Sequence, residues 1–225
     1  MKTVNMLGSY VHHFEPASDP AAPPLLLLHG TGGNEKDLLP LGRSLSPGSA
    51  LLSPRGTVRE NGAARFFARV SEGIFDSAEV ARRTQELADF IVSASNEYGL
   101  PLSRLVVVGF SNGANIAASL LLIRPIVLGG AVLLRPMVVI DSPAAPRSLE
   151  TKRVLIASGL QDPLVPADHP HRLAAHLRAG GADVVLHTHP AGHGLAQSDI
   201  VTAQQWFATE RQMDRSEPSP TPPTI

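Results

Sequence analysis

Short apolar runs alternate with longer amphipathic stretches along most of the chain. Residues 25–28 and 105–108 are uninterrupted apolar runs, which is typical of strands buried on both faces of a sheet. Residues 77–96 carry the clearest helical pattern, with one apolar face at Val80, Thr84, Leu87 and Ile91. This alternation predicts an α/β fold with a mostly parallel central sheet, helices on both of its faces and no large cap domain.

The same patterns predict the remaining elements. We expect further strands at residues 4–14, 49–54, 129–134, 153–158 and 183–188, and further helices at residues 35–44, 167–179 and 198–208. Ser77 is expected to cap its helix, and the stretch from Arg55 to Phe75 is expected to be irregular.

The last part of the chain differs in composition from the rest. From about Arg211 it is polar and rich in proline, with too little apolar surface to offset the entropy lost on ordering. We therefore expect a single domain over residues 1–210 and a flexible polar tail over residues 211–225.

Composition and charge narrow the function classes. The chain has 225 residues, of which 43% are apolar and 17% charged, as in a globular protein with one substantial core. A net charge of -1 gives no reason to expect nucleic acid as a partner, and the absence of cysteine excludes disulfides and a thiol nucleophile. The N-terminus lacks the apolar segment of a secretory signal, and apolar runs such as residues 25–28 are far too short for a membrane span. We therefore expect a cytoplasmic protein.

The strand predicted at residues 105–108 leads directly into a candidate nucleophile. Gly109-Phe110-Ser111-Asn112-Gly113 has the G-x-S-x-G pattern of a tight turn between a strand and a helix, with the serine at its apex. In such a turn the residues two before and two after the serine are pressed together, so that side chains there would clash.

A second glycine-rich stretch follows residues 25–28. The segment His29-Gly30-Thr31-Gly32-Gly33 lacks the Gly-Lys-Ser/Thr of a phosphate-binding loop and the G-x-G-x-x-G of a dinucleotide site. It fits an oxyanion loop better, with the backbone N–H of Thr31 and that of Asn112 directed at a developing negative charge. His29 is expected to be a buried residue that fixes this loop.

An acid and a base follow the serine along the chain. Asp162 lies at the turn after the strand predicted at 153–158, and His193 lies between two glycines. The order Ser, Asp, His is that of α/β-hydrolases, in which the aspartate orients the histidine and the histidine takes the serine proton. Asp183, Asp199 and Asp168 are the rival acids, but none follows a strand at a turn.

Two histidine pairs offer an alternative chemistry. His12 and His13 are adjacent, and His187 and His189 point the same way if their strand continues. Either pair could bind a metal, but no third ligand is indicated, so surface or strand-face positions are favoured. We expect no metal and no cofactor.

Several motifs occur together and resemble one family. They are L-H-G-x-G-G-N-E-x-D-L-x-P-L at 28–41, E-N-G-x-x-R-F-F at 60–67, G-F-S-N-G-A at 109–114, G-x-x-D-P at 159–163 and A-G-H-G at 191–194. Together they resemble the phospholipase/carboxylesterase family of small α/β-hydrolases, nearest to its hydroquinone-stress esterases (the MhqD-like and MhqO-like hydrolases). The family commonly has glutamine after the serine where this chain has Asn112, which bears on substrate more than on mechanism.

The resemblance implies a serine carboxylesterase that acts on short-chain acyl esters of small molecules, without metal or organic cofactor. The family also contains acyl-protein thioesterases and lysophospholipases, so those activities stay open, as does a non-catalytic ligand-binding protein on the same fold. Family members are often homodimers. The expected walls of the acyl pocket are Phe66, Phe67, Met137 and Leu164, although adjacent phenylalanines are more commonly core residues.

Overall fold

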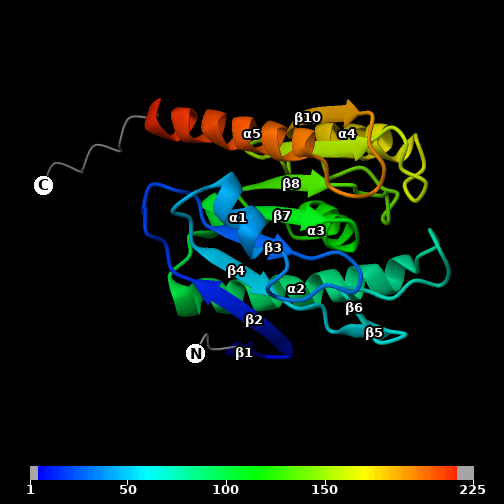
Figure 1. The fold of residues 1–225 in the computed structure, drawn as a ribbon, viewed down its shortest axis with the longest axis horizontal. Coiled ribbons are helices and arrows are strands. Elements are labelled where there is room, and N and C mark those ends of the chain that lie inside the picture. The colour runs from blue at the N-terminus through cyan, green and yellow to red at the C-terminus, as the bar shows by residue number, and fades with distance from the viewer. Residues whose placement is uncertain (1–4, 217–225) are drawn as a thin grey trace, which may run out of the picture.

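The computed structural model describes residues 5–216 and contains one eight-stranded sheet (Figure 1). The strand order is β1-β2-β4-β3-β7-β8-β9-β10. The strands are β1 (Asn5–Leu7), β2 (Tyr10–Glu15), β3 (Leu25–Leu28), β4 (Leu51–Pro54), β7 (Val106–Phe110), β8 (Gly130–Leu134), β9 (Arg153–Gly159) and β10 (Asp183–His189). From β4 to β10 every neighbouring pair is parallel, whereas β1 and β2 are antiparallel, which confirms the predicted, mostly parallel sheet.

Helices cover both faces of the sheet. They are α1 (Leu39–Leu45), α2 (Ser77–Tyr98), α3 (Asn112–Ile123), α4 (His169–Ala179) and α5 (Gln197–Ser216), with short 3-10 turns at Leu102–Arg104 and Pro125–Val127. One core lies between the sheet and α2, α3 and α4, and the other lies under α1 and α5. Leu26 and Leu28 of β3 face the first core, and Leu25 and Leu27 face the second. The uninterrupted apolar run therefore reflects burial on both faces.

The chain enters the sheet through a hairpin. The strand predicted at 4–14 is two strands, β1 and β2, which Gly8 separates at a φ of 57°. Glycine adopts this left-handed conformation without a steric penalty, so the chain reverses there.

A second hairpin lies in the stretch predicted to be irregular. It joins β5 (Val58–Glu60) to β6 (Ala63–Arg65) through Asn61 and Gly62, whose φ angles are 50° and 85°. Asn-Gly with two positive φ angles is the strongest short hairpin signal, so the sequence contained the information that the prediction missed.

Two helix ends differ from prediction. The cap of α2 is Asp76 rather than Ser77, because the Asp76 carboxylate accepts a hydrogen bond from the N–H of Ala78 at 2.9 Å. Helix α5 continues to Ser216, past the expected start of the tail at Arg211. The rest of the predicted tail, residues 217–225, lies outside the described residues. Within residues 5–216 no helix combines the length and the apolar composition needed to cross a membrane.

Candidate active site

Ser111 occupies a sharp turn between β7 and α3. Its φ is 52° and its ψ -116°, a conformation that side-chain-bearing residues rarely adopt and that costs about 1–3 kcal/mol. A Cβ on Gly109 would lie 2.5 Å from the carbonyl oxygen of Gly113, and a Cβ on Gly113 would lie 2.0 Å from that of Leu28. Neither position can hold a larger residue. The predicted close approach of the two glycines is confirmed at Gly109, whereas Gly113 is required by its contact with β3.

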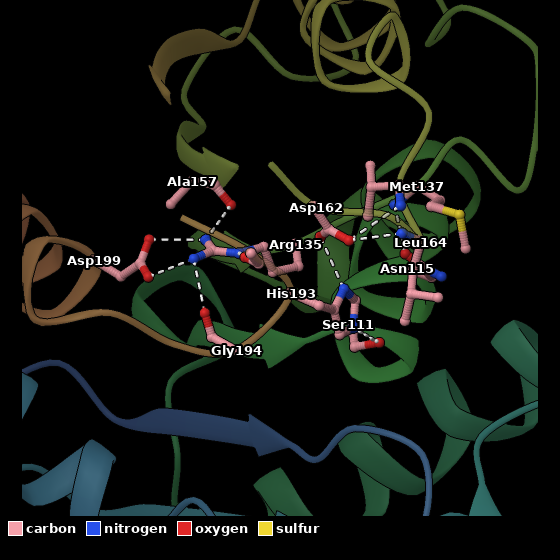
Figure 2. A network of polar contacts seen from close by, with 12 residues as sticks. Ser111, Asn115, Arg135, Met137, Ala157, Asp162, Leu164, His193, Gly194 and Asp199 are labelled. Carbon is pink, nitrogen blue, oxygen red and sulfur yellow. Dashed lines mark hydrogen bonds and ion pairs between the residues drawn. The ribbon is translucent and has the colours of Figure 1, made fainter. Parts of the chain in front are cut away.

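Ser111, His193 and Asp162 form one hydrogen-bonded chain (Figure 2). The Nε2 atom of His193 lies 2.9 Å from the Ser111 hydroxyl oxygen, and its Nδ1 atom lies 2.8 Å from Oδ2 of Asp162. A carboxylate can only accept, so Nδ1 carries the proton and donates it. In the neutral ring Nε2 is therefore the acceptor for the serine proton.

The Asp162 carboxylate is held in place by backbone donors. Its Oδ1 accepts hydrogen bonds from the N–H groups of Leu164 at 2.8 Å and Val165 at 3.3 Å, and its side chain is 1% exposed. The His193 side chain is 23% exposed and its ring packs 5.5 Å from that of Phe110. One nitrogen of the imidazole thus faces a buried anion, and the ring keeps access to the cavity.

The three rival carboxylates are engaged elsewhere. Asp168 pairs with Arg172 at 3.0 Å, Asp183 pairs with Arg153 at 3.3 Å, and Asp199 pairs with Arg135 at 2.7 Å.

His29 fixes the glycine-rich loop after β3, as expected. Its Nε2 accepts a hydrogen bond from the N–H of Gly56 at 3.0 Å, so the proton is on Nδ1, which donates to the carbonyl of Gly30 at 2.7 Å. The residue is buried, and burial lowers the pKa of its imidazole because the charged form would lose its hydration. The neutral ring thereby holds the start of the loop that carries Thr31.

Thr31 and Asn112 line the same cavity as Ser111. Asn112 is the first residue of α3, where backbone N–H groups have no partner within the helix. Its side chain has a separate role that the sequence did not reveal, since its Oδ1 accepts the N–H of Phe66 at 2.8 Å. Likewise Thr31 accepts a hydrogen bond on its hydroxyl from Arg65 at 2.6 Å. These bonds tie the end of β6 to the loop after β3, and Phe66, the residue that follows β6, to the start of α3.

The cavity over Ser111 has a volume of about 310 Å³. Its apolar lining comes from Phe75, Phe110, Met137 and Leu164, of which the last two were expected. Phe66 and Phe67 were also expected there, but both are fully buried in the core. The ring of Phe66 packs 4.8 Å from His29, and that of Phe67 packs edge-on to Phe75 at 5.4 Å.

One wall of the cavity is charged, which the sequence did not predict. Arg65 and Arg69 both reach it, together with Glu72. Glu60 contacts both arginines, with the Nε atom of Arg65 at 3.3 Å and that of Arg69 at 2.6 Å. Burial lowers the pKa of the Arg65 guanidinium, with the charge of Glu60 acting in the opposite direction. The arginine charges are thus largely balanced by neighbouring carboxylates.

The histidine pairs have local partners. Nε2 of His12 lies 2.7 Å from the hydroxyl of Tyr98, and that of His13 lies 3.0 Å from a carboxylate oxygen of Glu15. The rings of His187 and His189 lie 5.1 Å apart, so the two do share a face. Within residues 5–216 no group of three or more His, Asp or Glu side chains is arranged to hold a metal ion.

Comparison with known proteins gives matches over most of the chain. The phospholipase/carboxylesterase family model matches residues 12–210. The protein MhqD of Bacillus subtilis (strain 168) is 46% identical over 183 residues, which are 81% of this chain and 91% of that protein. The crystal structure of the Bacillus cereus carboxylesterase is 41% identical, with a TM-score of 0.86 over 90% of this chain and 95% of that one. A carboxylesterase from Mesorhizobium loti is 30% identical, with a TM-score of 0.83 over 92% of this chain and 98% of that one.

Proposed function

The chain belongs to the phospholipase/carboxylesterase family, and on that premise we propose that it hydrolyses short-chain carboxylic esters through an acyl-enzyme on Ser111. The observation that carries the proposal is the hydrogen-bonded chain from Ser111 through His193 to Asp162, of which Ser111 and His193 line a cavity. A serine hydroxyl is a weak nucleophile until a neutral imidazole can take its proton, and the tautomer of His193 leaves Nε2 free to do so.

The reaction follows from these positions. The Ser111 oxygen attacks the ester carbonyl carbon while its proton passes to Nε2 of His193, and Asp162 stabilises the resulting imidazolium. The backbone N–H groups of Thr31 and Asn112 donate to the carbonyl oxygen as it becomes negative. His193 then gives its proton to the leaving alkoxide, so that an alcohol departs and the acyl group stays on Ser111. A water molecule attacks this ester by the same route and releases the acid.

The preference for short acyl chains rests on the cavity. Its volume of about 310 Å³ is at the small end for a ligand site, and its apolar lining faces a wall of paired charges at Arg65 and Arg69. A long alkyl chain placed along that wall would desolvate charged groups without forming hydrogen bonds to them.

The nucleophile is tested by Ser111→Ala with p-nitrophenyl acetate and butyrate. We expect turnover to fall by about 10⁴-fold or more and labelling by a fluorophosphonate probe to be lost. Ser119→Ala is the matched control, because Ser119 is buried in the same helix and donates only to the carbonyl of Asn115, at 3.0 Å. Wild-type turnover in Ser111→Ala would refute the mechanism, and an unlabelled, inactive wild type would favour a ligand-binding protein.

The substrate class is tested by a chain-length series of esters and matching thioesters. We expect C2 to C4 esters to give the highest kcat/KM. A strong preference for C12 or longer chains, or for thioesters, would overturn the short-ester proposal and favour lysophospholipase or thioesterase activity.

A further inference from the structure

Arg135 is the first residue after β8, the strand that lies between those carrying Ser111 and Asp162. Its side chain is 0% exposed, which is exceptional for an arginine. Its φ is 59°, in the left-handed region that arginine rarely adopts. Its guanidinium lies among Asp199, Ala157 and Gly194, the residue after His193 (Figure 2).

Every N–H of the Arg135 guanidinium has an acceptor. Its Nε donates to the carbonyl of Gly192 at 3.0 Å, and its Nη2 donates to that of Gly194, also at 3.0 Å. Its Nη1 reaches the carbonyl of Ala157 in β9 at 3.3 Å. The two remaining bonds go to the carboxylate of Asp199, at 2.8 Å and 2.7 Å. The planar guanidinium therefore joins β9 and the Asp199 carboxylate to the carbonyls of the two glycines that flank His193.

The anchor side of this network is built into the core. Asp199 lies in the first turn of α5, its side chain is 1% exposed, and its Oδ2 also accepts the N–H of Ala196 at 2.7 Å. Helix α5 packs on the sheet through Ala203, Trp206 and Phe207, which are all buried. The carbonyl of Ala157 belongs to β9, which pairs with a strand on each side. Arg135 is thus held by a buried helix terminus and by a strand of the main sheet.

The loop side contains two glycines with open space around their α-carbons. A Cβ on Gly194 would meet no atom within 4 Å, and one on Gly192 would meet only the carbonyl oxygen of Gln161, at 3.9 Å. Both glycines therefore lie in open surroundings and add backbone freedom to the loop. Another tie is the bond from the N–H of Gln161 to the carbonyl of Ala191, at 3.0 Å.

We propose that Arg135 is a positioning residue for the hydrolysis, which holds His193 in reach of Ser111 and Asp162 by binding the carbonyls on both sides of it. The inference rests on the proposed function of these three residues. A buried ion pair by itself contributes little to stability compared with apolar residues of similar volume. A positioning role accounts better for the buried guanidinium than a stabilising role, because its hydrogen bonds fix two points of the histidine loop relative to β9 and α5.

Arg135→Lys tests this role. A lysine ammonium keeps the charge next to Asp199, but its three donors cannot reproduce the planar fork to Gly192 and Gly194. We expect kcat for p-nitrophenyl butyrate to fall by about 10- to 100-fold with KM changed less than about threefold, because misplacement of a catalytic group by about 1 Å costs on this scale. The downfield NMR signal of the His193 Nδ1 proton should broaden or disappear.

A structural role alone would give a different result. Leu177→Ala is the control, since Leu177 is fully buried in α4 and its truncation destabilises the fold without touching the histidine loop. This variant should keep the His193 signal and a kcat within about threefold of wild type. If Arg135→Lys behaves like Leu177→Ala, the positioning role is refuted.

The double variant Arg135→Met/Asp199→Leu covers the case in which Arg135→Lys does not fold. It replaces the buried ion pair by apolar side chains, which commonly leaves stability unchanged or improved. We expect it to fold with the same loss of kcat and of the His193 signal, and a wild-type kcat would overturn the proposal. Ser111→Ala and His193→Ala, assayed in parallel, distinguish failure of the proposed function from failure of the positioning role. If these two variants keep activity, the proposed function is wrong. If they lose activity and the Arg135 variants keep it, the positioning role is wrong.

Discussion

Gly159 is the position at which a single methyl group should disable the site while leaving the fold intact. It ends β9 and lies under the histidine loop. A Cβ there would be 2.2 Å from the carbonyl oxygen of Ala191 and 2.6 Å from that of Gly192. Normal van der Waals contacts of a Cβ begin at 3.4 Å. The Ala191 carbonyl oxygen in Gly159→Ala must therefore move away by about 1.2 Å, the difference between 3.4 Å and 2.2 Å.

That displacement is large compared with the tolerance of the site. Nε2 of His193 lies 2.9 Å from the Ser111 oxygen, and a shift of this size along the bond would bring the separation to about 4 Å, beyond hydrogen-bond reach. Misplacement of a catalytic group by this distance typically lowers the rate by about 10²-fold. This loss corresponds to about 2.7 kcal/mol of transition-state stabilisation. We therefore expect kcat of Gly159→Ala to fall by about 10²-fold.

The assay is kcat and KM for p-nitrophenyl butyrate, with the urea midpoint measured on the same samples. Gly194→Ala is the matched control, because a Cβ at Gly194, next to His193, meets nothing within 4 Å and its φ is not positive. We expect that variant to stay within about threefold of wild type. Equal kcat values for Gly159→Ala and Gly194→Ala would refute the reasoning, because the loop would then absorb the methyl group without moving the histidine.

Three further predictions test the roles of core residues, cavity residues and buried polar groups in stability and activity. Phe66→Ala should lower the free energy of unfolding by about 3–5 kcal/mol with unchanged chain-length preference, whereas Phe75→Ala should shift the kcat/KM optimum to longer acyl esters. Burial lowers the pKa of His29, so the stability that its neutral ring contributes is fully present above about pH 6.5 and should be lost as the pH falls below that value; urea midpoints should show a weaker pH dependence in His29→Gln. Asn115→Ala removes the acceptor for the Met137 N–H, at 2.6 Å, and should cost about 1–3 kcal/mol in urea unfolding; an unchanged midpoint would contradict this.

The features that the sequence predicted well are those set by local sterics and by strand order. Gly109 is required because the turn brings the carbonyl of Gly113 and the backbone of Ala114 close to it, and Gly113 is required because the backbone of Leu28 in the neighbouring strand β3 packs against it. Asp162 and His193 could be placed because the carboxyl ends of parallel strands meet at one edge of a sheet. Their catalytic roles stay predictions, as do the cytoplasmic location and the homodimer.

The features that the sequence missed depend on where side chains point across the fold. Arg135 follows a strand like many surface arginines, and only the structure shows that Asp199, 64 residues later, faces it. Phe66 and Phe67 directly follow Arg65, which lines the cavity, but their rings pack against His29 and Phe75 and are buried in the core. No periodicity in the sequence records such contacts.

The backbone angle of Ser111 has a consequence for laboratory evolution. Its φ of 52° stores strain of about 1–3 kcal/mol, which glycine would not incur. Ser111→Gly should therefore stabilise the fold by relieving this strain. The added freedom of the unfolded chain offsets about 0.5–1 kcal/mol of that gain. Selection of variants for heat resistance alone would thus favour loss of the nucleophile. Such a selection therefore has to be combined with a screen for activity.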